Sequence, residues 1–171
     1  MSAKEQSWVE YKPRTILKDV LPLETPFSLQ VEPARACNFK CVYCYHYNER
    51  EADNNKYLSV GSYRSLFESS WKFKQKLKSV TFGGKGEPLL NKGIFEMIRM
   101  TEQIAQETVL ITNGSLLTQE TVDNLLDSGL TTMRISLQGL DADGYYKTCG
   151  HKMDFDRFLR SIEYAHAGGE E

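Results

Sequence analysis

Three cysteines stand close together in the stretch ARACNFKCVYCYH, at positions 37, 41 and 44. Their spacing, three residues and then two, brings three thiolates into one short loop. A structural zinc site needs four ligands, and so does a fully ligated iron–sulfur cube. Three thiolates can instead hold three irons of a cube and leave the fourth iron open to a small molecule. The segment therefore predicts a catalytic metal centre with one free coordination position.

A structural zinc module is the main alternative from another class of protein. It would need a fourth ligand, for which Cys149 or His46 is available. Structural zinc sites usually contain two paired cysteine knuckles, and only CVYC has that form here. We favour the iron–sulfur interpretation, in which Cys149 is a packed small residue and His46 a polar loop residue.

The composition is that of an ordinary globular domain. The chain has 171 residues, of which 40% are hydrophobic and 26% charged, and its formal net charge is −2. Scattered Lys and Arg argue against a nucleic-acid clamp, and no apolar run has the length of a membrane span. The N-terminus lacks the apolar core of a signal peptide. We therefore expect a cytoplasmic protein, in which clustered cysteines favour metal binding over disulfides.

Strand and helix patterns alternate four times after a preamble at residues 1–25. Alternating apolar residues predict strands at 27–32, 78–84, 108–114 and 131–139. Helices are predicted after caps at Ser59, Thr118 and Asp154 and over roughly 93–105, with Gly129 ending the third. Their predicted apolar stripes are Tyr63, Leu66, Phe67 and Trp71; Ile94, Ile98 and Ile104; Val122, Leu125 and Leu126; and Phe155, Phe158, Leu159 and Ile162.

This order of elements predicts an α/β fold with a parallel sheet and right-handed crossovers. The first and fourth strands alternate cleanly, which leaves one polar face. We interpret that face as the lining of a wet cavity, so that the fold is a partial (β/α) TIM-like barrel of about four βα units. A flat sheet with one solvated face is the alternative. The polar positions are Ser28, Gln30, Glu32, Arg134, Ser136 and Gln138.

The distinctive stretches all follow the strands at the same end. The cysteines follow the first strand, GGKGEP the second and TNG the third, while SLQG ends the fourth. In sheets of this kind, the residues at the carboxyl ends of the strands carry the chemistry. The sequence therefore places one site at this end of the sheet.

The cysteine spacing CNFKCVYC resembles the signature of the radical S-adenosylmethionine (radical SAM) superfamily, CxxxCxxC with an aromatic residue, here Tyr43, before the last cysteine. The resemblance implies that Cys37, Cys41 and Cys44 ligate a [4Fe-4S] cluster whose open iron binds S-adenosyl-L-methionine. It implies reductive cleavage of that cofactor to a 5′-deoxyadenosyl radical, which abstracts a substrate hydrogen. A reductant such as flavodoxin or ferredoxin would supply the electron.

A second motif, GKGEPLL, is similar to the Gly-Gly-Glu-Pro turn of the same family. The resemblance implies cofactor contacts at Gly84, Gly86 and Glu87, where turn carbonyls accept bonds from the methionine ammonium. It places ribose and carboxylate contacts on Ser136 and Gln138. It also suggests Asn113 in TNG, although an Asn-Gly turn explains that stretch equally well.

Other stretches, including ITNGSLLT and YYKTCGHKMDFDRFL, resemble the SPASM subgroup, whose members modify peptides, proteins and carbohydrates. The family core has six strand–helix units, and this sequence shows four, so residues 26–171 are interpreted as a truncated core. Its two open strand edges predict a homodimer around a lumen lined by Glu32, Arg134 and Gln138. The alternative is a monomer whose edges are covered by the preamble, through Trp8, Val9 and Tyr11.

Overall fold

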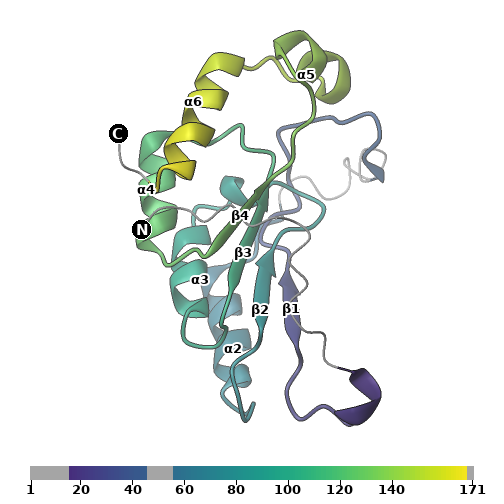
Figure 1. Cartoon of the computed structure of the whole chain (residues 1–171), viewed down its shortest axis with the longest axis vertical. Coiled ribbons are helices and arrows are strands. Elements are labelled where there is room, and N and C mark those ends of the chain that lie inside the picture. The colour runs from purple at the N-terminus through teal and green to yellow at the C-terminus, as the bar shows by residue number, and fades with distance from the viewer. Residues whose placement is uncertain (1–15, 46–55, 169–171) are drawn as a thin grey trace.

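Four parallel strands form one sheet in the order β1-β2-β3-β4, which is also their order along the chain (Figure 1). The computed structural model describes residues 16–45 and 56–168. The arrangement confirms the predicted α/β fold and the partial barrel, because sequential parallel strands are what a (β/α) barrel segment contains. The strands are β1 (Ser28–Val31), β2 (Ser79–Phe82), β3 (Thr108–Thr112) and β4 (Thr132–Ile135).

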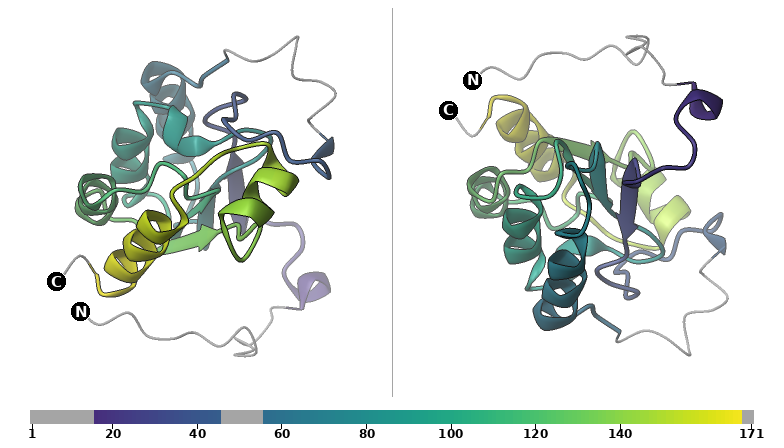
Figure 2. Two further views of the ribbon diagram at one scale, coloured as in Figure 1. Left: turned by 90° about the horizontal axis from the view of Figure 1, so that it is seen from above. Right: turned by 90° about the horizontal axis from the view of Figure 1, so that it is seen from below.

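Helices α2, α3, α4 and α6 lie along the outer side of the curved sheet, and α5 lies apart beyond the end of β4 (Figure 2). None of the described helices has the length and apolarity needed to cross a bilayer. The helices are α2 (Val60–Ser70), α3 (Ile94–Thr101), α4 (Gln119–Asp127), α5 (Ala142–Cys149) and α6 (Phe155–His166), with short 3-10 turns η1 (Leu17–Asp19) and η3 (Pro88–Leu90).

The predicted helix starts are confirmed by their capping bonds. The side chains of Ser59, Thr118 and Asp154 each accept a hydrogen bond from the backbone amide three residues further on. Helix α4 ends just before Gly129, whose φ of 81° is costly for other residues. Helix α3 is shorter than predicted and ends at Thr101, although Ile104 beyond it is still buried.

The core lies between the sheet and its outer helices. Phe82 pairs in register with Val31 and Leu110, so these side chains share one face, where all three are buried. On the opposite face, Gln30 and Arg134 are exposed. The sheet therefore has one packed face. Its opposite face is open and polar over the edge strands β1 and β4, as the alternation predicted, whereas Val109 of β3 on that face is buried.

Several predicted stripe residues are exposed, so those predictions were wrong. A single layer of helices buries only the residues that point straight at the sheet, and the outer flank of each stripe stays in solvent. Trp71 follows the last turn of α2, and its ring lies edge-on to that of Phe67, with 5.5 Å between the ring centroids. The exposed residues are Leu66, Trp71, Leu126 and Leu159, and Leu137 beyond β4 is exposed as well.

Helix α5 was missed in the sequence. Asp141 caps its start, and Gly150, with a φ of 62°, ends it. The helix has only eight residues and includes Gly144, so its pattern is weak. In the structure Tyr145 is fully buried on α5 and Tyr146 is half exposed.

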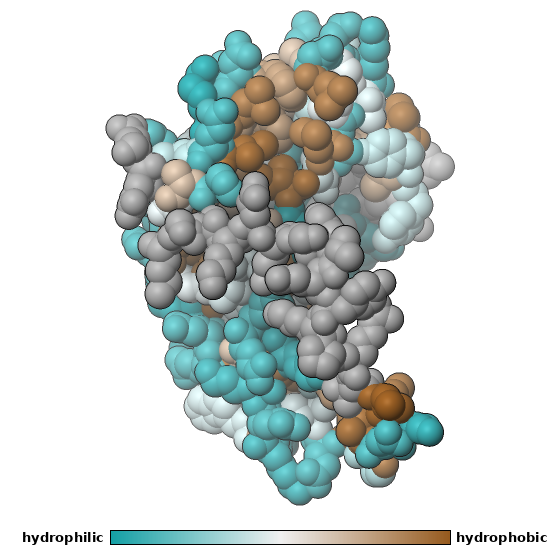
Figure 3. Space-filling view, in the orientation of Figure 1, coloured by the Kyte–Doolittle hydropathy of each residue, from teal (hydrophilic) through white to brown (hydrophobic). Residues whose placement is uncertain are grey.

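Apolar side chains gather at two places on the face seen in Figure 3, near the end that carries α5 and α6 and at η1. Among the described residues, β1 and β4 each have a strand neighbour on one side only. Unpaired edges beside exposed apolar side chains favour association. The alternative cover at Trp8, Val9 and Tyr11 lies outside the described residues.

We predict that the chain self-associates, because pairing of two half-barrels would satisfy both edges. Sedimentation velocity across the micromolar range measures this directly, and the average mass should rise with concentration. A monomer of constant mass throughout that range would contradict the pairing.

Candidate cofactor site at the carboxyl ends of the strands

The four distinctive stretches meet at one end of the sheet, as predicted. The backbone amide of Glu87, after β2, donates to the carbonyl of Ala36 in the cysteine loop at 2.8 Å. The amide of Asn113, after β3, donates to the Glu87 carboxylate at 2.8 Å, and that of Ser136, after β4, to the Thr112 carbonyl at 2.9 Å. These bonds join the ends of all four strands into one rim.

Glu87 is the most buried charged group of this rim, with 1% of its surface exposed. One carboxylate oxygen accepts bonds from the Thr112 hydroxyl (2.7 Å) and the Leu89 amide (3.1 Å), and the other accepts from Asn113. Burial raises the pKa of Glu87, and these three bonds oppose that shift without cancelling it. The buried side chain therefore anchors the turn after β2 to the end of β3.

The glycines of the β2 turn allow close approach to the cysteine loop. A Cβ on Gly86 would lie 2.2 Å from the carbonyl oxygen of Ala34 and 2.5 Å from that of Ala36. Gly84 has a φ of 155°, and a Cβ there would meet the Glu32 carboxylate. The Glu32 carboxylate in turn accepts the Lys85 amide at 2.7 Å. The GKGE sequence is thus required by packing inside the protein itself.

Asn113 ties the end of β3 to the cysteine loop. Its side-chain amide nitrogen donates to the side-chain oxygen (Oδ1) of Asn38 at 2.9 Å and lies 3.9 Å from the Cys37 sulfur. The Ser115 hydroxyl donates to Asn113 at 2.7 Å and accepts from Asn38 at 2.7 Å. Asn38 and Ser115 were not singled out in the sequence, because only this long-range contact reveals them.

Helix α5 holds the other side of the loop. The amides of Lys40 and Val42 donate to the carbonyls of Cys149 (2.7 Å) and Thr148 (3.0 Å), which the end of the helix would otherwise leave without partners. Phe39 is almost fully buried, edge-on to Tyr145 at 6.1 Å between ring centroids. The loop that carries the cysteines is thus fixed by a helix a hundred residues away.

The three motif cysteines lie on this supported loop and form no disulfide with one another. Cys41 is buried, while Cys37 and Cys44 are half buried. Within residues 16–45 and 56–168, no three His, Cys, Asp or Glu side chains converge on one metal-ion position. Ligands of a cube bind different irons and need not converge, so three thiols on one fixed loop fit a [4Fe-4S] cluster.

Cys149 packs in the same apolar cluster as Cys41 and is fully buried. Burial, followed by the neighbouring Cys41 thiol, raises the pKa of Cys149 to about 12. Its full burial in the cluster with Phe39, Tyr145 and Phe158 fits a packing role. His46, the other candidate for a fourth ligand, lies outside the described residues.

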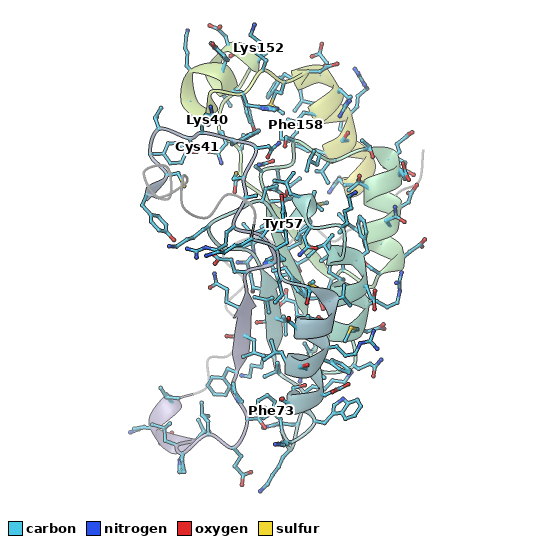
Figure 4. The ribbon with its side chains drawn as sticks, turned by 180° about the vertical axis from the view of Figure 1, so that it is seen from behind. Lys40, Cys41, Tyr57, Phe73, Lys152 and Phe158 are labelled. Carbon is cyan, nitrogen blue, oxygen red and sulfur yellow. The ribbon has the colours of Figure 1, made fainter. Side chains whose placement is uncertain are left out.

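The remaining predicted contacts lie around the loop. Tyr43 is largely exposed, and partial burial together with the Cys41 thiol raises its pKa to about 12, so the phenol stays protonated. Ser136 and Gln138 are half buried beyond β4. The backbone amide of Gln138 donates to the Tyr145 hydroxyl at 3.2 Å. Figure 4 shows Cys41 at this end of the molecule, between Lys40 and Tyr57.

Comparisons with known proteins agree with this site. A family model, the radical SAM superfamily, matches residues 31–170. A probable GTP 3',8-cyclase of Methanocella arvoryzae is 30% identical over 138 residues, which are 81% of this chain and 43% of that protein. The chain belongs to the radical SAM superfamily.

Solved structures show the same likeness. Streptococcus suis SuiB bound to the precursor peptide SuiA is 27% identical, with a TM-score of 0.67 over 91% of this chain and 34% of SuiB. SuiB bound to S-adenosylmethionine is 26% identical, with a TM-score of 0.64 over 91% of this chain and 33% of SuiB. The chain thus spans less than half the length of this cyclase and of SuiB.

We predict that Gly86→Ala destabilises the protein by about 1–3 kcal/mol, since the new methyl group meets backbone that cannot move aside. Gly61→Ala, on helix α2 with only Ser59 near the new methyl group, is the matched control and should stabilise by about 0.5–1 kcal/mol. Urea unfolding of both variants measures the difference. Equal free energies of unfolding would show that the turn does not pack against the loop.

Glu87 should make the protein less stable as pH rises. Its pKa is raised on folding, so the folded state binds the proton more tightly than the unfolded state. The stabilising contribution is complete below the ordinary value of 4.5 and is lost as pH rises through the raised pKa. The free energies of unfolding of the wild type and Glu87→Gln, measured from below pH 4.5 upward, should depend on pH with different slopes. Parallel curves would contradict the assignment.

Proposed function

We propose that this chain forms the cofactor-binding part of a radical SAM enzyme, with a [4Fe-4S] cluster held by Cys37, Cys41 and Cys44. The observation that carries the proposal is a three-thiol loop fixed on both sides at the carboxyl ends of a parallel sheet. When bound, the cluster and S-adenosyl-L-methionine together supply a 5′-deoxyadenosyl radical. A protein reductant such as flavodoxin or ferredoxin supplies the electron, and a reducing cytoplasm suits the free thiols.

The chain's own residues bind and orient the cofactor in this proposal. Carbonyls of the turn at Gly84 and Gly86 accept from the methionine ammonium, and Ser136 and Gln138 supply polar groups from β4. Tyr43 offers an exposed ring beside Cys44. Asn113 keeps Cys37 in place through the contact at 3.9 Å. Glu87 positions the turn from within the protein and does not touch the cofactor through its carboxylate.

A peptide or protein is the substrate class that we propose. The support is the likeness to SuiB, which was solved with a bound precursor peptide. The open face of the sheet, with Gln30 and Arg134 exposed, offers polar groups to a substrate. A carbohydrate is the alternative, and 5′-deoxyadenosine release in the presence of each class distinguishes them.

Anaerobic reconstitution with iron and sulfide should yield four irons per chain, because the three thiolates ligate one cube. Changing Cys37, Cys41 or Cys44 to Ala should abolish the cluster absorption, whereas Cys149→Ala, the matched control, should keep it. Stoichiometric zinc binding with failed reconstitution would favour the zinc module. Loss of iron in Cys149→Ala would make Cys149 a ligand.

S-adenosyl-L-methionine should change the electron paramagnetic resonance spectrum of the reduced cluster, because it binds the open iron. Ser136→Ala should weaken this binding by about 1–3 kcal/mol through the loss of one polar partner. Ser65→Ala on the exposed side of α2 is the control. Identical titration curves for the two variants would remove Ser136 from the site.

A further inference from the structure

The cysteine loop and the end of α5 form an exposed surface that cofactor binding leaves unused. We call it the Lys40 face and define it by Lys40, Val42, Tyr146 and Lys152. The Lys152 ammonium lies 5.9 Å from the centroid of the Tyr146 ring. The Lys40 side chain lies 3.5 Å from the position of a Cβ on Gly150. Figure 4 shows Lys40 and Lys152 at the same end of the molecule as Cys41.

The Lys40 face combines apolar and basic groups. Val42 is 74% exposed and Tyr146 51% exposed, although both belong to well-anchored backbone. Among the described residues, Lys40 and Lys152 have no carboxylate within salt-bridge distance. The neighbouring Lys147 is already paired with Asp143 on α5, at 2.7 Å. Within the part of the chain that the structure describes, the face therefore combines two lysines that form no salt bridge with two exposed side chains, Val42 and Tyr146.

The face also lies directly over a proposed cluster ligand. Lys40 precedes Cys41 in the chain, and the amides on both sides of Cys41 are bonded to the end of α5. An electron arriving here would reach Cys41 through a rigid, tightly packed segment. The opposite side of the loop, toward Ser136 and the sheet, is left for cofactor and substrate.

We propose that the Lys40 face docks an acidic one-electron carrier protein, an inference that rests on the proposed function. In the transfer, an anionic flavin hydroquinone loses one electron and becomes the neutral semiquinone, and the cluster held by the three cysteines gains that electron; no proton moves. Electron-transfer encounters use small interfaces of mixed apolar and charged character. Complementary charge then raises the association rate, which suits a few unpaired lysines.

The test compares two double variants with the same change in net charge. Lys40→Glu with Lys152→Glu reverses the charge of the face. Lys18→Glu with Lys72→Glu changes two exposed lysines near η1 and Phe73, at the opposite end of the molecule (Figures 1 and 4). Photoreduced flavodoxin is mixed with each reconstituted protein at low salt, and cluster bleaching is followed. Dithionite, a small reductant that needs no docking surface, provides the reference.

The proposal predicts a loss of about tenfold or more in the flavodoxin rate for the Lys40 and Lys152 variant only, fading at high salt. Dithionite should reduce every variant equally. Equal flavodoxin rates in the two double variants would overturn the docking surface while leaving the cluster intact.

If dithionite reduces no cluster in the wild type, the proposed function fails. In that case, the affinity of oxidised flavodoxin for the two double variants still tests the docking surface, and equal affinities would overturn it. If the double variant loses iron, the single variant Lys152→Glu, which lies outside the cysteine motif, replaces it in the comparison.

Discussion

The buried carboxylate of Glu87 is the interaction on which the arrangement of the site depends. It joins the turn after β2 to the end of β3 through Thr112 and Asn113, while its own amide holds the cysteine loop at Ala36. Burial of a carboxylate is costly unless its oxygens are hydrogen-bonded, and here three donors meet it. A single residue, through its carboxylate and its backbone amide, thereby fixes the relative positions of three segments.

The cysteine loop needs this outside support because a cluster demands thiols at set positions. The Gly86 turn packs against one side of the loop, and the carbonyl end of α5 accepts its amides on the other. Rigid elements on both sides hold a metal site more accurately than a loop alone. The same clamp leaves Val42 in solvent, on the face where the proposed redox partner would dock.

The parts that local chemistry determines were predictable from the sequence. The caps at Ser59, Thr118 and Asp154 predict their helices because a cap acts over three residues. The cysteine spacing indicated the superfamily, which the family model confirmed. Contacts between distant residues were not predictable. A glutamate in a polar turn is expected in solvent, so nothing in GKGEP reveals that Glu87 is buried against β3. Helix α5 was missed because Gly144 weakens its pattern, and with it the role of Phe39 as an anchor.

The central claim is that the three thiols on the loop held between the turn after β2 and helix α5 ligate one [4Fe-4S] cluster. Diffraction at the iron absorption edge, from anaerobic crystals of the reconstituted protein, tests it most directly. The account predicts four irons within bonding distance of the Cys37, Cys41 and Cys44 sulfurs, with the bonds from Lys40 to Cys149 and from Glu87 to Ala36 unchanged. Iron bound to Cys149, or a loop that has left helix α5 to reach the metal, would contradict it.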